Sequence, residues 1–250
     1  MDKITGRPCM LFHAALCAGL AMAPAVALAA NPFAGAESPS MLEAAGKAAA
    51  ADPQTLEQKP DVYLQLISGM QQRGLYYASL AHLDAFETRW PGRDDATLLR
   101  AHALRESGQT EAARSMYRKL VDGSLAARAH HGLGLIEMRA GNIEEGSAAL
   151  NRAAALAPTD ATILGDQGYA YLMLGRLDEA RLALFKAAEL DEGNKRIGAN
   201  LALLLALSGK LEQAQELMQR YDLAPRVRAD ILARAGDVRS GLKITKELAQ

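Results

Sequence analysis

Six glycines recur at nearly constant spacing along most of the chain, and this spacing is the strongest constraint on its fold. Their successive sequence numbers differ by 34, 33, 34, 34 and 27. Each glycine lies between two segments in which apolar residues recur with the period of a helix. A period of about 34 residues in helical sequence is typical of an array of helix–turn–helix units stacked into a solenoid. The six glycines are Gly74, Gly108, Gly141, Gly175, Gly209 and Gly236.

Other residue types keep their distance from these glycines. Five residues after each glycine stands a small residue, and nine residues after it a larger one, such as Leu83, Leu150 or Leu184. Two antiparallel helices can approach closely only where side chains are small, and large apolar residues one turn away fill the groove that remains. Pro91 and Pro158 stand where a second helix must end. The small residues are Ser79, Ala113, Gly146, Ala180, Ala214 and Gly241.

The composition agrees with an all-α fold and excludes several function classes. Aromatic residues make up only 5% of the chain, while Ala, Leu, Glu, Gln and Arg, which favour helices, are abundant. A β-sandwich or β-barrel is therefore disfavoured. The formal net charge of -1 argues against nucleic-acid binding, which usually requires a basic excess.

The first 29 residues have the organisation of a secretory signal peptide. Lys3 and Arg7 precede an apolar run over residues 10–23, and small residues follow up to the expected cleavage after Ala29 or Ala30. The run is shorter than the roughly 20 residues that span a bilayer, which disfavours the alternative of a retained membrane anchor. The mature protein is then expected in the periplasm.

Both cysteines, Cys9 and Cys17, lie in this removable segment, so the mature chain has no thiol chemistry. Cys17 is the alternative acceptor of a lipid in an outer-membrane lipoprotein, but Leu16 is unsuited to that processing signal. Residues 30–59 are rich in Ala, Pro and Ser and are predicted to be a linker, with a possible short helix over 41–51 capped by Ser40.

The array over residues 60–250 resembles the tetratricopeptide repeat family. The best copies are 127–160 and 161–194, and the second contains Gly168, Tyr171, Gly175, Ala180 and Leu184. The resemblance covers about 190 of the 250 residues. It implies a right-handed α-solenoid of about five full repeats and a shortened C-terminal unit. The expected repeats are about 60–93, 94–126, 127–160, 161–194, 195–221 and 222–250.

We find no pattern of catalytic residues. His130 and His131 are adjacent on a predicted helix and point about 100° apart, so they cannot share a metal ion. Glu144 and Glu145 follow a repeat glycine, where carboxylates favour the start of the second helix. Gly132-Leu133-Gly134 lies in a helical repeat with no preceding strand, which disfavours a phosphate loop. The chain is therefore not expected to be an enzyme or to hold a cofactor, metal ion or small-molecule substrate.

The resemblance implies a partner-binding groove lined by the first helix of each repeat. In this family, positions two, five, six, nine, twelve and thirteen of that helix face the partner. The alternative is that Leu135, Leu172 and Leu203 fill contacts between neighbouring helices. Tyr169 and Met173 suit a ligand-facing surface better. The matching groove residues are Arg105, His131, Leu135, Met138, Asp166, Tyr169, Leu172, Met173, Asn200 and Leu203, with Arg128, Arg139 and Arg196 beside them.

The groove is expected to be apolar towards the C-terminus and more charged towards the N-terminus. It would then receive an apolar peptide or an amphipathic helix of another envelope protein.

The run Asp166-Gln167-Gly168-Tyr169 with Asn200-Leu201, behind a signal peptide, looks most like the TadD family of tight-adherence (Flp) pilus assembly. That resemblance implies a secretin or another pilus-assembly component as partner, and association with the outer membrane through it. Two alternatives remain. The array could organise a polysaccharide-export or cell-wall machinery, or act as the non-catalytic helper subunit of a periplasmic enzyme.

Overall fold

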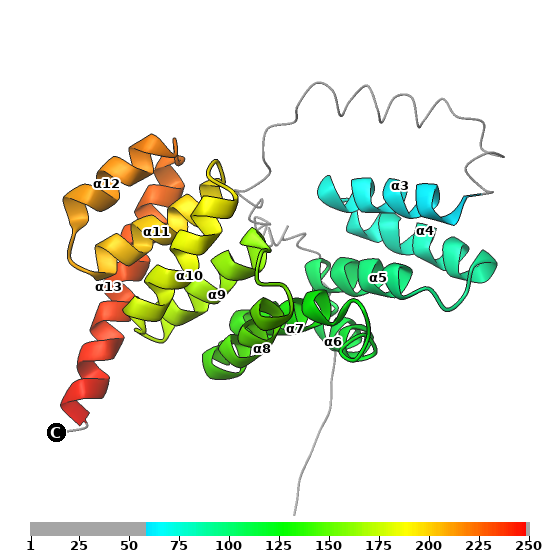
Figure 1. The fold of residues 1–250 in the computed structure, drawn as a ribbon, viewed down its shortest axis with the longest axis horizontal. Helices are drawn as coiled ribbons and strands as arrows, with labels where there is room; N and C mark the ends of the chain where they lie inside the picture. Colours follow the sequence, from blue (N-terminus) through cyan, green and yellow to red (C-terminus); the bar gives the residue numbers. More distant parts are fainter. Residues whose placement is uncertain (1–58, 249–250) are drawn as a thin grey trace, which may run out of the picture. The chain divides into compact units, whose positions relative to one another are not determined.

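A computed structural model describes residues 59–248, and within that range every regular element is an α-helix (Figure 1). Side chains are described up to Gly236. The predicted signal peptide, both cysteines and the linker helix over 41–51 lie outside the described residues. The helices are α3 (Pro60–Gln72), α4 (Tyr76–Arg89), α5 (Asp94–Glu106), α6 (Thr110–Arg118), α7 (Ala126–Ala140), α8 (Ile143–Leu156), α9 (Ala161–Met173), α10 (Leu177–Leu190), α11 (Lys195–Leu207), α12 (Leu211–Arg220) and α13 (Pro225–Leu248).

The first ten of these helices form five consecutive pairs. We call α3, α5, α7, α9 and α11 the first helices, and α4, α6, α8, α10 and α12 the second helices. Within each pair the two helices pack against each other, and successive pairs contact one another through neighbouring helices. This arrangement confirms the predicted all-α solenoid. None of the described helices combines the length and the apolar character needed to cross a bilayer.

Each pair turns at the glycine that the spacing predicted. Gly74, Gly108, Gly141, Gly175 and Gly209 all have positive φ, between 70° and 86°. The residue after each glycine donates its N–H to the carbonyl five residues earlier, as Arg176 does to Tyr171 at 2.9 Å. This is the Schellman ending of a helix, in which glycine adopts the left-handed conformation without a steric penalty.

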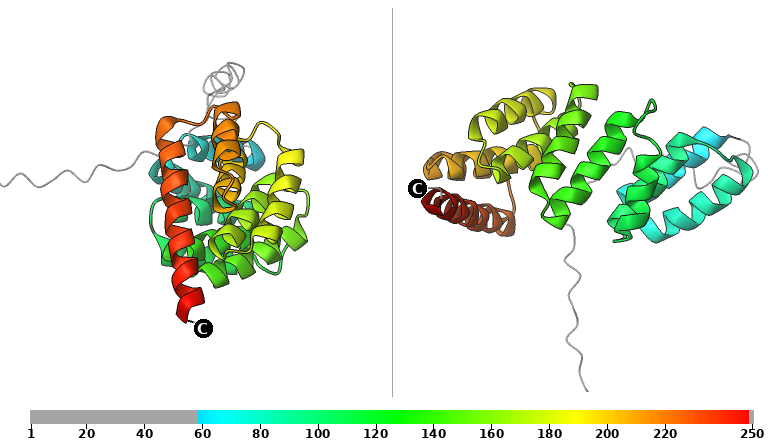
Figure 2. Two further views of the ribbon diagram at one scale, coloured as in Figure 1. Left: turned by 90° about the vertical axis from the view of Figure 1, so that its left-hand side faces the viewer. Right: turned by 90° about the horizontal axis from the view of Figure 1, so that it is seen from below.

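The sixth glycine has a different role from the one predicted. Gly236 lies inside α13, which runs as one helix to the end of the described chain (Figure 2). It follows Ala202 by one full repeat, as Ala202 follows Gly168 and Gly168 follows Gly134. Gly236 therefore continues the small residues of the first helices, not the series of turn glycines. The expected turn at Gly236 is wrong, and the short last interval arose from comparing two different positions of the repeat.

The landmark residues within each pair pack as predicted. Gly134 faces Leu150, and Gly168 faces Leu184 so closely that an added Cβ would lie 2.6 Å from the leucine Cγ. The five small residues and the five larger ones of the complete pairs are all buried, among them Leu184 with no exposed surface. Small side chains thus let the two helices approach, and the larger side chains fill the groove between them.

Two other glycines make room for aromatic rings between consecutive pairs. Gly132 of α7 lies against the ring of Tyr117 from α6, and Gly198 of α11 lies against Tyr221, which follows α12. At both glycines a Cβ would overlap the ring. The two glycines of Gly132-Leu133-Gly134 therefore serve helix packing, which explains their presence without a phosphate ligand.

The helix boundaries follow local sequence signals. Asp160 and Asn194 precede α9 and α11, and each side-chain oxygen accepts hydrogen bonds from two backbone N–H groups of the first turn. Such caps satisfy donors that have no partner inside the helix. The second helices α4 and α8 end at Arg89 and Leu156, just before Pro91 and Pro158, as predicted.

Candidate partner-binding face

Side chains of the first helices meet their neighbours along the array. α3 contacts α5, α5 contacts α7, α9 contacts α11, and α11 contacts α13. The hydrogen bond between His131 of α7 and Asp166 of α9 connects α3, α5 and α7 with α9, α11 and α13. We call the half-buried and exposed side chains of α5, α7, α9, α11 and α13 on this side the first-helix face.

Asp166 connects three helices at the centre of this face. Its carboxylate belongs to a residue that is only 4% exposed, and two side chains share it. His131 Nε2 lies 2.8 Å from Asp166 Oδ2, and the guanidinium of Arg196 on α11 pairs with Oδ1. A buried carboxylate needs such partners because its desolvation would otherwise be costly. Asp166 therefore acts inside the array, and its own oxygens are already occupied.

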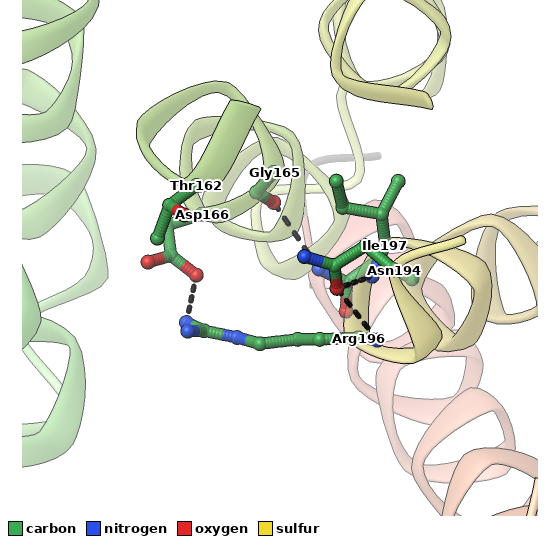
Figure 3. Close-up of a pocket in the computed structure, with 7 residues that line it drawn as sticks. Thr162, Gly165, Asp166, Asn194, Arg196 and Ile197 are labelled. Atoms are coloured by element: carbon green, nitrogen blue, oxygen red, sulfur yellow. Dashed lines mark hydrogen bonds and ion pairs between the residues drawn. The ribbon is translucent and has the colours of Figure 1, made fainter. Parts of the chain in front are cut away.

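A small pocket lies beside this carboxylate, between α9 and α11 (Figure 3). Its volume of about 40 Å³ has room for a few water molecules and not for a larger ligand. The Nδ2 of Asn200 donates to the carbonyl oxygen of Gly165 at 3.1 Å and closes one side. In Figure 3 the Arg196 side chain extends from α11 towards the Asp166 carboxylate. The lining residues are Thr162, Gly165, Asp166, Asn194, Arg196, Ile197 and Asn200.

Tyr169 lies one helical turn after Asp166 and meets the last described helix. Arg234 of α13 donates to the Tyr169 hydroxyl, and its guanidinium carbon lies 5.7 Å from the ring centroid. A guanidinium above an aromatic ring is stabilised by the ring quadrupole. The guanidinium groups of Arg196 from α11 and Arg234 from α13 thus contact residues of the same turn of α9.

The part of the face nearer the N-terminus is held by a second polar cluster. Arg105 is buried and donates from Nε to the Tyr117 hydroxyl at 3.3 Å, while its Nη1 lies 2.8 Å from Glu106. Arg139 of α7 donates to the backbone oxygen of Arg105 at 3.3 Å. Burial, and then the charge of Arg105, lowers the pKa of His102 to about 4. His102 is therefore neutral at physiological pH.

Four of the predicted groove residues are buried and do not form part of the exposed surface. Leu172 and Leu203 are 0% and 2% exposed and belong to one apolar core, so they fill contacts between helices. Arg105 and Asp166 are buried in the polar clusters described above. The assignment of these four side chains to a partner-facing surface is corrected accordingly. The position of a residue in the repeat did not tell whether its side chain is exposed or buried, because neighbouring first helices cover part of each other.

The other predicted residues are half-buried, and several already have partners within the chain. Met138 packs over Gly146, where an added Cβ would lie 2.8 Å from its Cγ and Sδ. Asn200 is committed to Gly165. Leu135 and Met173 are partly exposed, and Met173 also packs against the apolar core. Their binding to a partner stays a prediction.

Arg234 was missed by the sequence analysis. It stands one full repeat after Asn200, which itself stands one full repeat after Asp166. This register would have identified Arg234 if Gly236 had been aligned with Ala202. The C-terminal part of the face therefore presents Arg234 in addition to the expected Arg196. Among the described residues no group of three or more His, Cys, Asp or Glu side chains is arranged to hold a metal ion.

Comparisons with known proteins identify the same repeats. The tetratricopeptide repeat family model matches residues 98–161 and 131–196. The TPR repeat-containing protein PA4299 of Pseudomonas aeruginosa is 36% identical over 187 residues, which covers 75% of this chain and 74% of that protein.

Several solved structures share the fold. PilF of Pseudomonas aeruginosa is 20% identical with a TM-score of 0.58 and covers 75% of this chain and 90% of that one. The TPR protein TTC0263 of Thermus thermophilus is 21% identical with a TM-score of 0.55, covering 72% and 98%. MamA of Desulfovibrio magneticus is 18% identical with a TM-score of 0.51, covering 65% and 92%. The repeat spacing, the helix pairs and these matches together show that the chain belongs to the tetratricopeptide repeat family.

Proposed function

We propose that this protein is a non-catalytic scaffold of the bacterial envelope that assists assembly of a Flp/Tad pilus secretion apparatus. It does so by binding a segment of a secretin or another assembly component on the first-helix face. The mature protein acts in the periplasm after removal of residues 1–29, and it reaches the outer membrane through its partner.

The observation that carries this proposal is the partial exposure of apolar and aromatic side chains on the first-helix face. Tyr169, Met173 and Leu135 remain partly exposed, although the small and large landmark residues of the complete pairs are buried. Tetratricopeptide repeats bind protein partners, and an aromatic ring beside a thioether suits such contacts. The pilus system is supported by the sequence resemblance to the TadD family.

Crosslinking in cells tests the proposal at Tyr169. A photoreactive amino acid replaces Tyr169, and in a matched strain it replaces Tyr77, which lies on the second helix α4 and is 72% exposed. Light is expected to join the first variant, but not the second, to a secretin or another pilus-assembly protein, identified by mass spectrometry.

Other results would contradict the proposal in defined ways. Recovery of lipid or glycan alone at position 169 would exclude the pilus role. Capture of a glycan synthase or polysaccharide exporter would favour an organiser of those machineries. Equal capture of one protein at positions 169 and 77 would exclude the first-helix face as the binding surface.

A further inference from the structure

The two sets of helices in the later repeats differ in charge. α7, α9, α11 and α13 up to Gly236 contain seven Lys or Arg residues and three Asp or Glu residues, whereas α8, α10 and α12 contain four and seven. The near-zero net charge of the whole chain conceals this separation. The seven cationic residues are Arg128, Arg139, Lys195, Arg196, Arg226, Arg228 and Arg234.

Two of the three carboxylates on α7, α9, α11 and α13 are paired within the chain, and the third, Asp230, is exposed on α13. Glu137 pairs with Arg114 of α6 and accepts a hydrogen bond from Asn142 at 2.9 Å. Asp166 is buried between His131 and Arg196. By contrast, Arg128 and Arg234 are exposed and have no carboxylate partner in the part of the chain whose side chains are described.

Arg196 and Arg234 also converge. Arg196 reaches Asp166, and Arg234 reaches Tyr169 three residues later on α9. Residues three apart on a helix are surface neighbours, with Cβ atoms about 5–6 Å apart. Two guanidinium groups from different helices therefore lie around one helical turn that holds a single buried carboxylate. Arg196 balances that carboxylate, so the exposed guanidinium of Arg234 is the excess positive charge at this turn.

From this arrangement we propose that the first-helix face across α9, α11 and α13 binds an acidic segment of the partner protein, with a carboxylate at Arg234 and Arg196. The inference rests on the proposed function and names the chemistry of its partner. Guanidinium groups bind carboxylates with two parallel hydrogen bonds. The Tyr169 ring contacts Arg234, Met173 lies one turn later on α9, and both half-buried side chains can contact an apolar side chain of the same segment. Charge complementarity favours this occupant over the apolar peptide expected from the sequence.

Peptide binding to the purified mature chain tests the inference directly. The probe is a fluorescein-labelled peptide of alternating glutamate and leucine, and its twin carries lysine in place of glutamate. The acidic peptide is expected to raise the anisotropy, and its affinity is expected to fall as NaCl rises from about 50 to 500 mM, because exposed charges are screened.

Two substitutions on the face are compared with one outside it. Arg234→Gln and Arg196→Gln are each expected to weaken binding of the acidic peptide about fivefold to tenfold, as expected for loss of a charge-assisted hydrogen bond. Arg181→Gln on α10 is the control, since Arg181 is exposed and pairs with Asp178 on its own helix. It should bind as the unmodified chain does. Arg234→Gln is the decisive variant, because it leaves no buried carboxylate unpaired and should not disturb folding.

Three results would overturn the inference. They are unchanged affinity in Arg234→Gln, equal binding of the lysine twin, and self-association of the chain that Arg234→Gln abolishes in sedimentation experiments. Self-association of this kind would mean that the first-helix face binds a second copy of this chain.

The outcome is also distinguishable from failure of the proposed function. If crosslinking at position 169 captures an assembly protein that Arg234→Gln still binds normally, the scaffold role stands and the acidic specificity fails. If the acidic peptide binds as expected but position 169 captures no assembly protein in cells, the specificity stands and the pilus role fails.

Discussion

The first helix pair and the last repeats are built on the same spacing but are held together differently. Around α3 and α4 the core is small and aromatic: Phe86 stacks near Tyr63, and the ring centroids of Phe86 and Trp90 lie 4.9 Å apart. From α8 to α13, alanine and leucine side chains form one continuous apolar cluster. The same repeat thus encloses separate small cores in one region and a shared core in the other.

Polar contacts join the first two pairs. Gln71 is 4% exposed and donates to the carbonyl oxygen of Leu99 at 2.8 Å, while its Oε1 lies 2.8 Å from Nδ1 of His102. Arg100 of α5 pairs with Asp84 and Glu87 of α4. Hydrogen-bonded junctions contribute less net free energy than extensive apolar burial. In a repeat array, whose stability is a sum over units and interfaces, the first pair should therefore open before the later repeats.

The chain contains a reporter for this difference. Trp90 is the only tryptophan and lies against Phe86 in the first core. Its fluorescence follows the first pair, whereas circular dichroism follows all helices. The following substitutions use both signals, and they are ordered from the largest expected effect to the smallest.

Leu184→Ala is expected to have the largest effect, about 2–5 kcal/mol, because it opens a cavity in the shared core. The main dichroism transition in urea should move to lower concentration. Leu83→Ala removes the equivalent side chain of the first pair, and both residues have no exposed surface. It should shift the Trp90 transition and leave the later dichroism transition in place. Coincident shifts of both signals in both variants would show that the array unfolds as one unit.

Gly132→Ala should cost about 1–3 kcal/mol, because the new methyl group would overlap the Tyr117 ring. Gly69→Ala is the matched control. Gly69 also lies within a helix, but no atom lies within 4 Å of its added Cβ, so alanine should be neutral or stabilise by up to about 1 kcal/mol. Thermal unfolding of the two variants measures the contrast. Equal melting temperatures would contradict the close packing of α6 and α7.

His102 should make the first region sensitive to pH. Its pKa in the folded chain is lowered to about 4 from 6.5, chiefly by burial. Below about pH 6.5 the unfolded chain gains a proton that the folded chain does not, so stability is complete above that pH and falls as pH decreases towards 4. The urea midpoint of Trp90 fluorescence should decrease over this range. His102→Gln should reduce this dependence, and an unchanged pH profile would rule out His102 as its source.

Arg100→Gln should have the smallest effect, up to about 1 kcal/mol, because both its partners are substantially exposed and ion pairs at the surface are screened. The Trp90 midpoint measures it. High salt should reduce the difference between the variant and the unmodified chain. A loss well above this range would mean that the junction between α4 and α5 depends on this ion pair far more than its exposure indicates.

The predictions from sequence succeeded where the relevant contacts are local or repeated. Turn glycines, proline stops and the paired landmarks such as Gly168 and Leu184 could be recognised because each lies within one repeat. The prediction failed at Gly236, where a glycine of the first-helix series was aligned with the turn series. Residues such as Leu172 were harder, because a leucine at a groove position can point towards a neighbouring helix or towards solvent.

The amino-acid order alone was enough to establish the repeat, its turns and the all-α class, since these depend on backbone conformation and on side-chain volume at fixed separations. The stacked helices decided which side chains stay exposed. Arg234 donates a hydrogen bond to Tyr169, 65 residues earlier in the sequence, and Leu203 is buried in the core. Both outcomes depend on how each helix is rotated against its neighbours, which is set by the packing of all pairs together and by no single repeat.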